Sequence, residues 1–355
     1  MKYPAIAAAG LAALSVLAAC VVPPGLRGQT EEHHVLVQSW DGNTEKIPDG
    51  WQYIEIDGPV CANGTPVGMG LNAGDDSSDL VIYLNGGGAC WDTQSCNLFQ
   101  TAANLDITYN ADRMAEELGP LVGAGLLDRT SDVHPFPDAH MAFIPYCTGD
   151  LHSGQQITKY DSFAGEQALH HRGADNIKHY LQFLSQRYGD ARRVWLVGTS
   201  AGGYGITWNF EHFQAAFPDA EIHVFADASP WLRLDDEMWA QWRRTWGLTL
   251  PTGCVMCEIA PDHLLRFLIE SNPETRFAMS VHKRDSTLAA FLRLRPAELE
   301  RDIAWFLQER YYGDNTSAFV AEGSDHEAIL ELNNGLTDQD GQSLAEFFRR
   351  WALGE

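Results

Sequence analysis

The most informative segment of the chain reads Val194-Trp195-Leu196-Val197-Gly198-Thr199-Ser200-Ala201-Gly202-Gly203. It opens with an apolar run typical of a buried strand, and residues 204–213 after it have an amphipathic, helix-like pattern. Between the two lies Gly-x-Ser-x-Gly, the sequence of a sharp strand-to-helix turn that exposes a serine. Such a turn is strained, and glycine or alanine flanks the serine here. We therefore predict that Ser200 is a nucleophile at the end of a central strand.

Further apolar runs and helical patterns alternate along the chain on both sides of this segment. Most of the runs are bounded by Gly, Asp, Pro or Asn and are typical of buried parallel strands; they cover 80–84, 141–144, 222–226 and 277–281. Apolar residues at three- and four-residue spacing predict helices over 173–188, 298–312 and 343–353. This alternation predicts an α/β fold with a mostly parallel sheet covered by helices on both faces, and the serine turn after a strand is typical of the α/β-hydrolase type.

Two stretches do not follow the alternation. Residues 98–137 combine a possible helix at 111–118 with turns rich in Gly and Pro, and residues 232–270 are irregular and rich in Trp. We interpret both as insertions that shape or cover a pocket. Ligands of such sheets bind at the carboxyl ends of the strands, where the motifs of this chain also fall.

Length and composition fit one exported domain. The 355 residues, 45% hydrophobic with 11 Trp, can bury the core of one large α/β domain, which we place at 35–355. The net charge of -24 repels phosphate backbones, which argues against a nucleic-acid partner. It also disfavours strongly anionic polymers as tight ligands. We expect a monomer.

The first residues carry a targeting pattern. Lys2 and the apolar run 5–19 predict a signal peptide over 1–19, and Leu17-Ala18-Ala19-Cys20 resembles a bacterial lipoprotein cleavage box. Cys20 would then carry lipid, and 20–34 would be a tether, so that the only membrane contact is the anchor. An ordinary cleaved signal peptide is the alternative. Either way we expect an exported protein: an outer-membrane or periplasmic lipoprotein, or a secreted one.

The cysteine count fits an oxidising compartment. Of seven cysteines, setting Cys20 aside leaves six, and the close pairs Cys90/Cys96 and Cys254/Cys257 suggest local bridges. Cys61 and Cys147 are then left to pair with each other. A zinc site at Cys254 and Cys257 would need two more ligands at metal spacing, and no convincing pair is near. We expect no metal and no cofactor.

A glycine-rich loop, Leu84-Asn85-Gly86-Gly87-Gly88-Ala89-Cys90, follows the first strong strand. A tetrahedral intermediate needs two or three N–H donors aimed at one oxygen, and only a backbone free of Cβ crowding approaches so closely. We predict that the amides of Gly87, Gly88 and Ala201 form this oxyanion hole. A phosphate-binding loop would carry Lys and Ser/Thr directly downstream, and that pair is absent.

Together these motifs resemble the pectin acetylesterase/Notum family of carboxylesterases over about 51–348. The resemblance rests on four short blocks, at 61–66 (Cys-Ala-Asn-Gly-Thr-Pro), 84–96, 144–154 (with Pro-Tyr-Cys-Thr-Gly-Asp) and 198–203. It implies a Cys61–Cys147 bridge, which agrees with the cysteine count. The family loop usually carries Trp just after its glycines, whereas here Ala89 precedes Cys90 and Trp91 follows it. The size of the acyl pocket therefore stays open.

The remaining triad members must follow Ser200 in the order acid, then histidine. His326 lies in a polar loop before a helical pattern and resembles the family's Ser-x-His-Glu segment, so we predict that it is the general base. Asp285 follows the strand at 277–281, resembles the family's strand-end Asp and is our predicted acid. Asp227, which ends the strand at 222–226, is the rival acid and resembles a different family Asp near the substrate pocket.

The motifs thus predict a serine carboxylesterase that hydrolyses acyl esters through an acyl-enzyme. The resemblance implies acetyl esters of glycans above all, and the net charge of -24 makes a neutral acetylated glycan or a small ester a more plausible substrate than a bare polyuronate. We assign Asp150, Asp227 and Trp91 to the substrate pocket. The alternative enzyme is a lipase or fatty-acyl carboxylesterase. A surface lipoprotein that binds glycans without catalysis is the alternative from another class.

Overall fold

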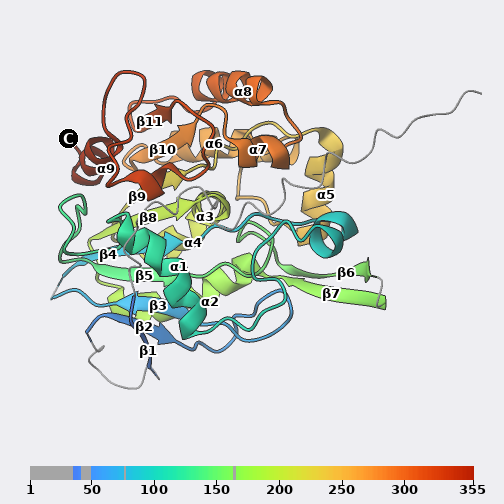
Figure 1. Ribbon diagram of the computed structural model, residues 1–355, viewed down its shortest axis with the longest axis horizontal. Helices are drawn as coiled ribbons and strands as arrows, with labels where there is room; N and C mark the ends of the chain where they lie inside the picture. Colours follow the sequence, from blue (N-terminus) through green and yellow to red (C-terminus); the bar gives the residue numbers. More distant parts are fainter. Residues whose placement is uncertain (1–34, 41–48, 76, 163–164) are drawn as a thin grey trace, which may run out of the picture.

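The computed structural model describes residues 35–40, 49–75, 77–162 and 165–355, and these form one nine-stranded sheet and one two-stranded hairpin (Figure 1). The large sheet has the order β1-β2-β3-β5-β4-β8-β9-β10-β11. Its strands are β1 Val37–Trp40, β2 Trp51–Ile54, β3 Met69–Asn72, β4 Asp79–Leu84, β5 His140–Ile144, β8 Arg193–Thr199, β9 Glu221–Asp227, β10 Phe277–His282 and β11 Thr316–Ala321. The predicted signal peptide, Cys20 and the tether lie outside the described residues.

The centre of the sheet is parallel, as predicted. Strands β5, β4, β8, β9 and β10 are neighbours and run in one direction, and each contains one of the predicted apolar runs. β3 is antiparallel to both of its neighbours, β2 and β5, so the sheet is mixed but mostly parallel. The hairpin pairs β6 Gln156–Ser162 with β7 Gly165–His171.

Alternate side chains of each central strand point to opposite faces of the sheet and enter different cores. Helices therefore cover both faces. On β4, Leu80, Ile82 and Leu84 belong to one core, and Val81 and Tyr83 belong to the other. The first core is closed by α2 Gly173–Tyr188, α3 Ala201–Trp208, α4 Phe210–Ala216, α5 Asp236–Trp246, α6 His263–Ser271, α7 Ser286–Phe291 and α8 Pro296–Glu309. The second is closed by α1 Ala111–Gly123 and α9 Leu344–Leu353.

The stretch at 232–270 is more regular than its sequence suggested. It forms α5 and most of α6, joined through a short 3-10 helix, Val255–Glu258. Asp235 caps α5 by accepting a hydrogen bond from the Met238 amide, and Gly247 ends it in the left-handed conformation. The interpretation of this stretch as irregular was therefore wrong, because we overlooked both caps. The possible helix at 111–118 is real and extends to Gly123.

Two other helix predictions need small corrections. The segment 204–213 is not one helix, since α3 ends at Trp208 and α4 starts at Phe210, with Asn209 between them. The predicted helix at 298–312 begins earlier, at Pro296, because proline is well tolerated at the first position of a helix. Among the described residues, no helix is both long and apolar enough to cross a bilayer.

Candidate active site

Ser200 stands at the tip of a strained turn between β8 and α3. Its φ is +51°, a left-handed conformation that is costly for a residue with a side chain. Glycines let α3 start so close to the sheet: a Cβ on Gly202 would lie 1.9 Å from the Leu84 carbonyl oxygen, and one on Gly203 would lie 2.0 Å from Ser229 Oγ. The turn thus requires the glycines that the sequence places there.

Three side chains that are distant in the sequence meet at this turn. His326 Nε2 lies 2.8 Å from Ser200 Oγ, and His326 Nδ1 lies 2.6 Å from Asp285 Oδ2. With its proton on Nδ1, the ring donates to Asp285 and accepts the serine proton. The other oxygen of Asp285 accepts a hydrogen bond of 2.8 Å from the Leu288 amide and so caps α7. This is the arrangement expected of a nucleophile, a base and an orienting acid.

The charges around His326 favour its protonated form. Burial lowers the pKa of the imidazole, but the charge of Asp285 and its hydrogen bond, with smaller contributions from Glu327 and Asp227, together raise it to about 9. The imidazolium that forms when Ser200 loses its proton is therefore well stabilised. The free base is correspondingly scarce near neutral pH.

Asp227, the rival acid, lies on the strand side of the turn and makes no hydrogen bond to His326 among the described residues. Its carboxyl accepts from Thr199 Oγ1 at 2.8 Å and from Ser280 Oγ at 2.6 Å, and its carbonyl accepts from the Ser200 amide. Burial raises its pKa to about 7, although the bonds from Ser280 and Thr199 lower it. Asp227 thus ties β8, β9 and β10 together below the serine.

Hydrogen bonds to its own carbonyl groups hold the glycine loop in place. Tyr146 OH donates to the Gly88 carbonyl at 2.8 Å, and Thr101 Oγ1 donates to the Ala89 carbonyl at 2.7 Å. A Cβ on Gly88 would lie 2.2 Å from the Thr101 carbonyl oxygen, so this position needs glycine. Gly88 and Ala201 line the cavity beside Ser200, as an oxyanion hole would require, whereas Gly87 is not among the lining residues.

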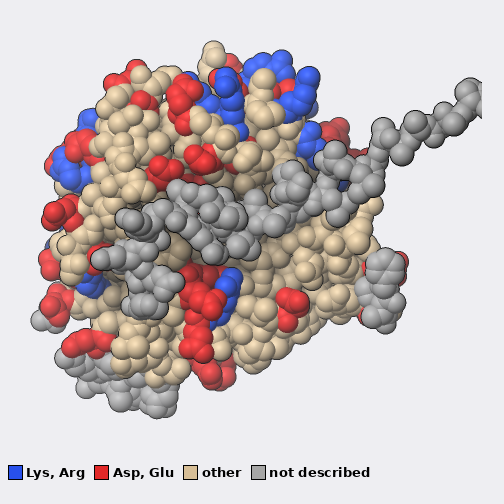
Figure 2. All heavy atoms as spheres, viewed as in Figure 1, with Lys and Arg blue, Asp and Glu red and all other residues tan. Residues whose placement is uncertain are grey.

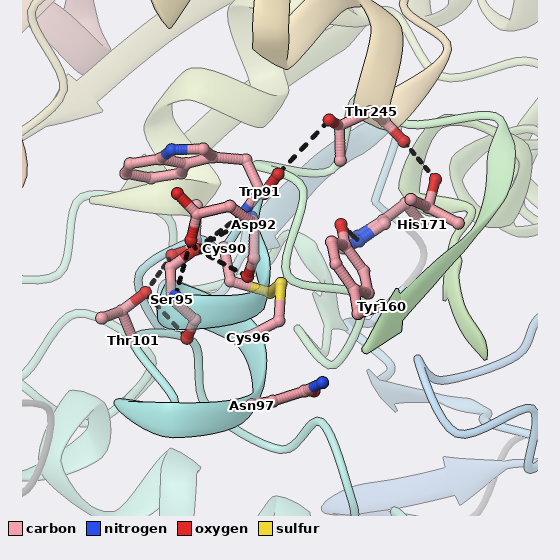
Figure 3. Close-up of a disulfide and its surroundings, with 12 residues drawn as sticks. Cys90, Trp91, Asp92, Ser95, Cys96, Asn97, Thr101, Tyr160, His171 and Thr245 are labelled. Carbon is pink, nitrogen blue, oxygen red and sulfur yellow. Dashed lines mark hydrogen bonds between the residues drawn. A yellow bond between two sulfur atoms is a disulfide. The ribbon is translucent and has the colours of Figure 1, made fainter. Parts of the chain in front are cut away.

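A disulfide anchors the far end of this loop (Figure 3). Cys90 is bonded to Cys96, its amide donates to the Gly149 carbonyl at 2.9 Å, and its carbonyl accepts from Trp246 Nε1 at 2.8 Å. The other two bridges also join the predicted pairs, Cys61–Cys147 and Cys254–Cys257. The anchored loop is therefore a rigid part of the site rather than a flexible turn.

A small, mostly apolar cavity opens beside Ser200. Its volume is about 30 Å³, and it is partly open to solvent. Its walls come from the glycine loop, the loop after β5, the turn itself, and helices α3, α5 and α7; the lining residues are Gly88, Ala89, Leu151, Ser200, Ala201, Tyr204, Trp242, Thr287, Leu288, Phe291, Leu292 and His326. The cavity has room for a group of a few atoms next to the nucleophile.

The three residues assigned to the substrate pocket do not line this cavity. Asp150 is fully buried and accepts hydrogen bonds from Thr148 Oγ1 and from the Gly173 amide, so it holds the start of α2. Asp227 lies below the turn, as described above. Trp91 packs against two residues that line the cavity, with its ring centroid 5.2 Å from that of Trp242 and 6.0 Å from that of Phe291.

Sequence reasoning missed the aromatic residues that line the cavity from the helices, Tyr204, Trp242 and Phe291, which we call the helical wall. They come from three different helices, and no local motif marks them. The available signal was the helical spacing of Trp239, Trp242 and Trp246 on α5, which predicts a buried face but not what it faces.

Two groups among the described residues have the donor types of a metal site. Cys90 and Cys96 lie near His171, but their sulfurs are joined to each other and offer no thiolate. His282, Asp325 and Glu331 also lie together, with the two acidic side chains partly or fully exposed. Neither group touches Ser200, so we derive no chemistry from them.

The comparisons with known proteins agree on the fold. The solved Wnt deacylase Notum from Drosophila superposes with a TM-score of 0.63 at 17% identity, covering 85% of this chain and 93% of that one. Among curated proteins, the chain is 28% identical over 194 residues to human "Palmitoleoyl-protein carboxylesterase NOTUM", covering 52% of this chain and 36% of that protein. It is 27% identical over 174 residues to "Pectin acetylesterase 4" of Arabidopsis thaliana, covering 48% of this chain and 40% of that protein.

The chain thus spans between a third and two fifths of the length of these two curated relatives. A family model described as Pectinacetylesterase matches residues 52–249, which is more than half of the chain. The match includes the glycine loop and Ser200 but ends before Asp285 and His326. With the strained serine turn and the Notum-like fold, it shows that this chain belongs to the pectinacetylesterase family.

Proposed function

We propose that this protein is a serine carboxylesterase that removes short acyl groups, acetyl above all, from an alcohol. The observation that carries the proposal is the chain of hydrogen bonds from Ser200 through His326 to Asp285, which stands beside the small cavity. Family membership supports ester hydrolysis as the reaction class.

In the proposed mechanism, Ser200 Oγ attacks the ester carbonyl while His326 Nε2 takes its proton. The amides of Gly88 and Ala201 stabilise the oxyanion, and one such donor typically contributes about 3 kcal/mol to lowering the barrier. His326 then returns the proton to the leaving alcohol. Water, activated by the same imidazole, releases the acid from the acyl-enzyme.

The size of the cavity supports a short acyl group. The acyl chain must lie beside Ser200, and the cavity of about 30 Å³ there, bordered by Trp242 and Phe291, holds a group of a few atoms such as a methyl group. The human relative is named a palmitoleoyl-protein carboxylesterase, so a longer acyl chain is the alternative substrate that the experiment must include.

The decisive experiment compares wild type with Ser200→Ala on p-nitrophenyl acetate and p-nitrophenyl octanoate. We expect kcat for the acetate to fall by about 10⁴-fold or more in the variant, with an unchanged circular dichroism spectrum. We also expect wild type to prefer the acetate. Turnover that survives in the variant would rule out the serine mechanism, and a preference for the octanoate would favour the fatty-acyl alternative.

We further propose that acetylated glycans are the substrates and that the enzyme works outside the cytoplasm. Three disulfides support an oxidising compartment. Acetate release from a panel of acetylated polysaccharides tests the substrate class. Mass spectrometry of the mature N-terminus tests whether Cys20 is lipidated.

A further inference from the structure

The cavity beside Ser200 lies against Gly88 and Ala89 and is not lined by Glu327, yet this carboxyl group also lies near the serine. Glu327 Oε1 lies 3.4 Å from the point that a Cβ on Gly86 would occupy, and that same point is 3.0 Å from Ser200 Cβ. The carboxyl group therefore packs against Gly86, next to the nucleophile and outside the cavity.

No protein donor uses the hydrogen-bonding capacity of this carboxyl group. Its oxygens take part in no hydrogen bond or ion pair within the part of the chain that the structure describes, although a carboxylate can accept about four hydrogen bonds. Burial raises the pKa of Glu327, His326 lowers it and Asp285 raises it. The side chain is half-buried and its oxygens are not among the fully buried atoms without a partner, so solvent reaches them and a ligand hydroxyl can take the place of that water.

In the proposed acyl transfer, the leaving alcohol lies next to His326. If the acyl group fills the cavity and the oxyanion faces Gly88 and Ala201, the leaving oxygen must face His326 Nε2, which protonates it. Glu327 is the next residue after His326. The atoms of the alcohol beyond its ester oxygen are therefore the part of the substrate within reach of this carboxyl group.

We propose that Glu327 is a binding residue for the alcohol and accepts a hydrogen bond from a free hydroxyl of a partially acetylated sugar. The inference rests on the proposed ester hydrolysis at Ser200 and adds to it the chemical class of the leaving group. An alcohol that lacks a second hydroxyl cannot make this bond.

The test compares two acetate esters that share the acyl group. One is a monoacetylated methyl glycoside with free neighbouring hydroxyls, and the other is phenyl acetate. In Glu327→Gln, we expect kcat/KM for the glycoside to fall about tenfold to a hundredfold, mainly through KM. Phenyl acetate should stay within about twofold of wild type. Both are measured on the pH-independent plateau, so that a changed His326 pKa does not enter.

Two further variants sharpen the result. Glu327→Asp keeps the charge but shortens the reach, and we expect the same selective loss with an unchanged pH profile. Glu331→Gln removes an equal charge four residues away, at a residue that is not among the main contributors to the His326 pKa, and should leave both substrates unaffected. Thermal unfolding of all three variants shows that each is folded.

Several outcomes would overturn the proposal. Equal losses on both esters, or a shift of the pH profile with unchanged plateau values, would mean that Glu327 acts only through His326. No change at all would mean that the alcohol does not reach it. Failure of the proposed function looks different, because wild type would then hydrolyse neither ester, or Ser200→Ala would still hydrolyse both.

Discussion

His326 is surrounded by three carboxyl groups, and their sum decides its protonation state. Burial alone would lower its pKa, yet Asp285, Glu327 and Asp227 raise it to about 9. A general base acts only when it is neutral. In the proposed acyl transfer, the field that would stabilise the imidazolium therefore also limits how much neutral His326 is present at pH 7.

The first prediction concerns pH. Because the folded pKa of His326 is raised above 6.5, the base form gains population as pH increases through about 9. We expect kcat/KM for p-nitrophenyl acetate to rise with pH over this range and then level off. A profile already flat from pH 7 would contradict the raised pKa.

The second prediction separates the two candidate acids. Asp285→Asn should lower kcat by about 10⁴-fold, because the wrong tautomer of His326 then faces Ser200. The rise of activity with pH should also move to lower pH, because the charge of Asp285 no longer raises the pKa of His326. Asp227→Asn should leave kcat within about tenfold but lower the melting temperature, because Asp227 bonds Thr199 and Ser280. The opposite pattern would make Asp227 the acid.

At the scale of elements, the glycine loop and the helical wall border different parts of the space around Ser200. The loop presents amides, and its own carbonyls are held by Thr101 and Tyr146. The wall limits volume, since Trp242 of α5 and Phe291 of the end of α7 both pack against Trp91. In the proposed mechanism, the loop stabilises the oxyanion and the wall selects the acyl group.

The third prediction tests the loop. In Gly88→Ala, the new Cβ would meet the Thr101 carbonyl at 2.2 Å, and the φ of +74° is unfavourable for alanine. We expect the loop to shift and kcat to fall about 10²- to 10³-fold with a smaller change in KM. Gly165→Ala, in the β6–β7 hairpin, has open space around its Cβ despite a positive φ and serves as the control. Full activity in Gly88→Ala would exclude this amide from the oxyanion hole.

The fourth prediction tests the wall. Phe291→Ala enlarges the cavity next to Ser200, so the octanoate-to-acetate ratio of kcat/KM should rise at least tenfold. Phe183→Ala shortens a partly buried phenylalanine of the same core away from the cavity, and it should leave the ratio unchanged. An unchanged ratio in Phe291→Ala would show that acyl chains do not enter there.

Over the whole molecule, the disulfides connect parts that the sheet alone does not hold. Cys61–Cys147 joins the loop before β3 to the loop after β5 over a separation of 86 residues, whereas Cys254–Cys257 spans three. The long bridge restricts the unfolded chain far more than the short one does.

The fifth prediction follows from these loop lengths. Replacing Cys61 and Cys147 together by Ser should lower the free energy of unfolding by about 4 to 5 kcal/mol, and replacing Cys254 and Cys257 by only about 1.5. Chemical denaturation of both double variants measures the difference. Equal losses would show that native contacts, and not loop closure, dominate.

Much of the central sheet could be predicted from local patterns. Strands β4, β5, β8, β9 and β10 are buried on both faces, so each reads as a continuous apolar run. β1, β2 and β3 have four residues each, too few for a periodic signal. The wall was beyond prediction, because which side of α5 meets Phe291 depends on how α5 and α7 pack on the sheet.

By itself, the sequence determined the serine turn, the glycine loop and the order of the triad, since each depends on backbone conformations that only particular residues adopt next to one another. The sequence also favoured Asp285 over Asp227 as the acid, and the structure places the Asp285 carboxyl group against His326. The tertiary structure alone decided that the cavity is small and that Glu327 borders Gly86. The reason is physical: these are contacts between side chains dozens to hundreds of residues apart, and packing of the whole chain fixes them.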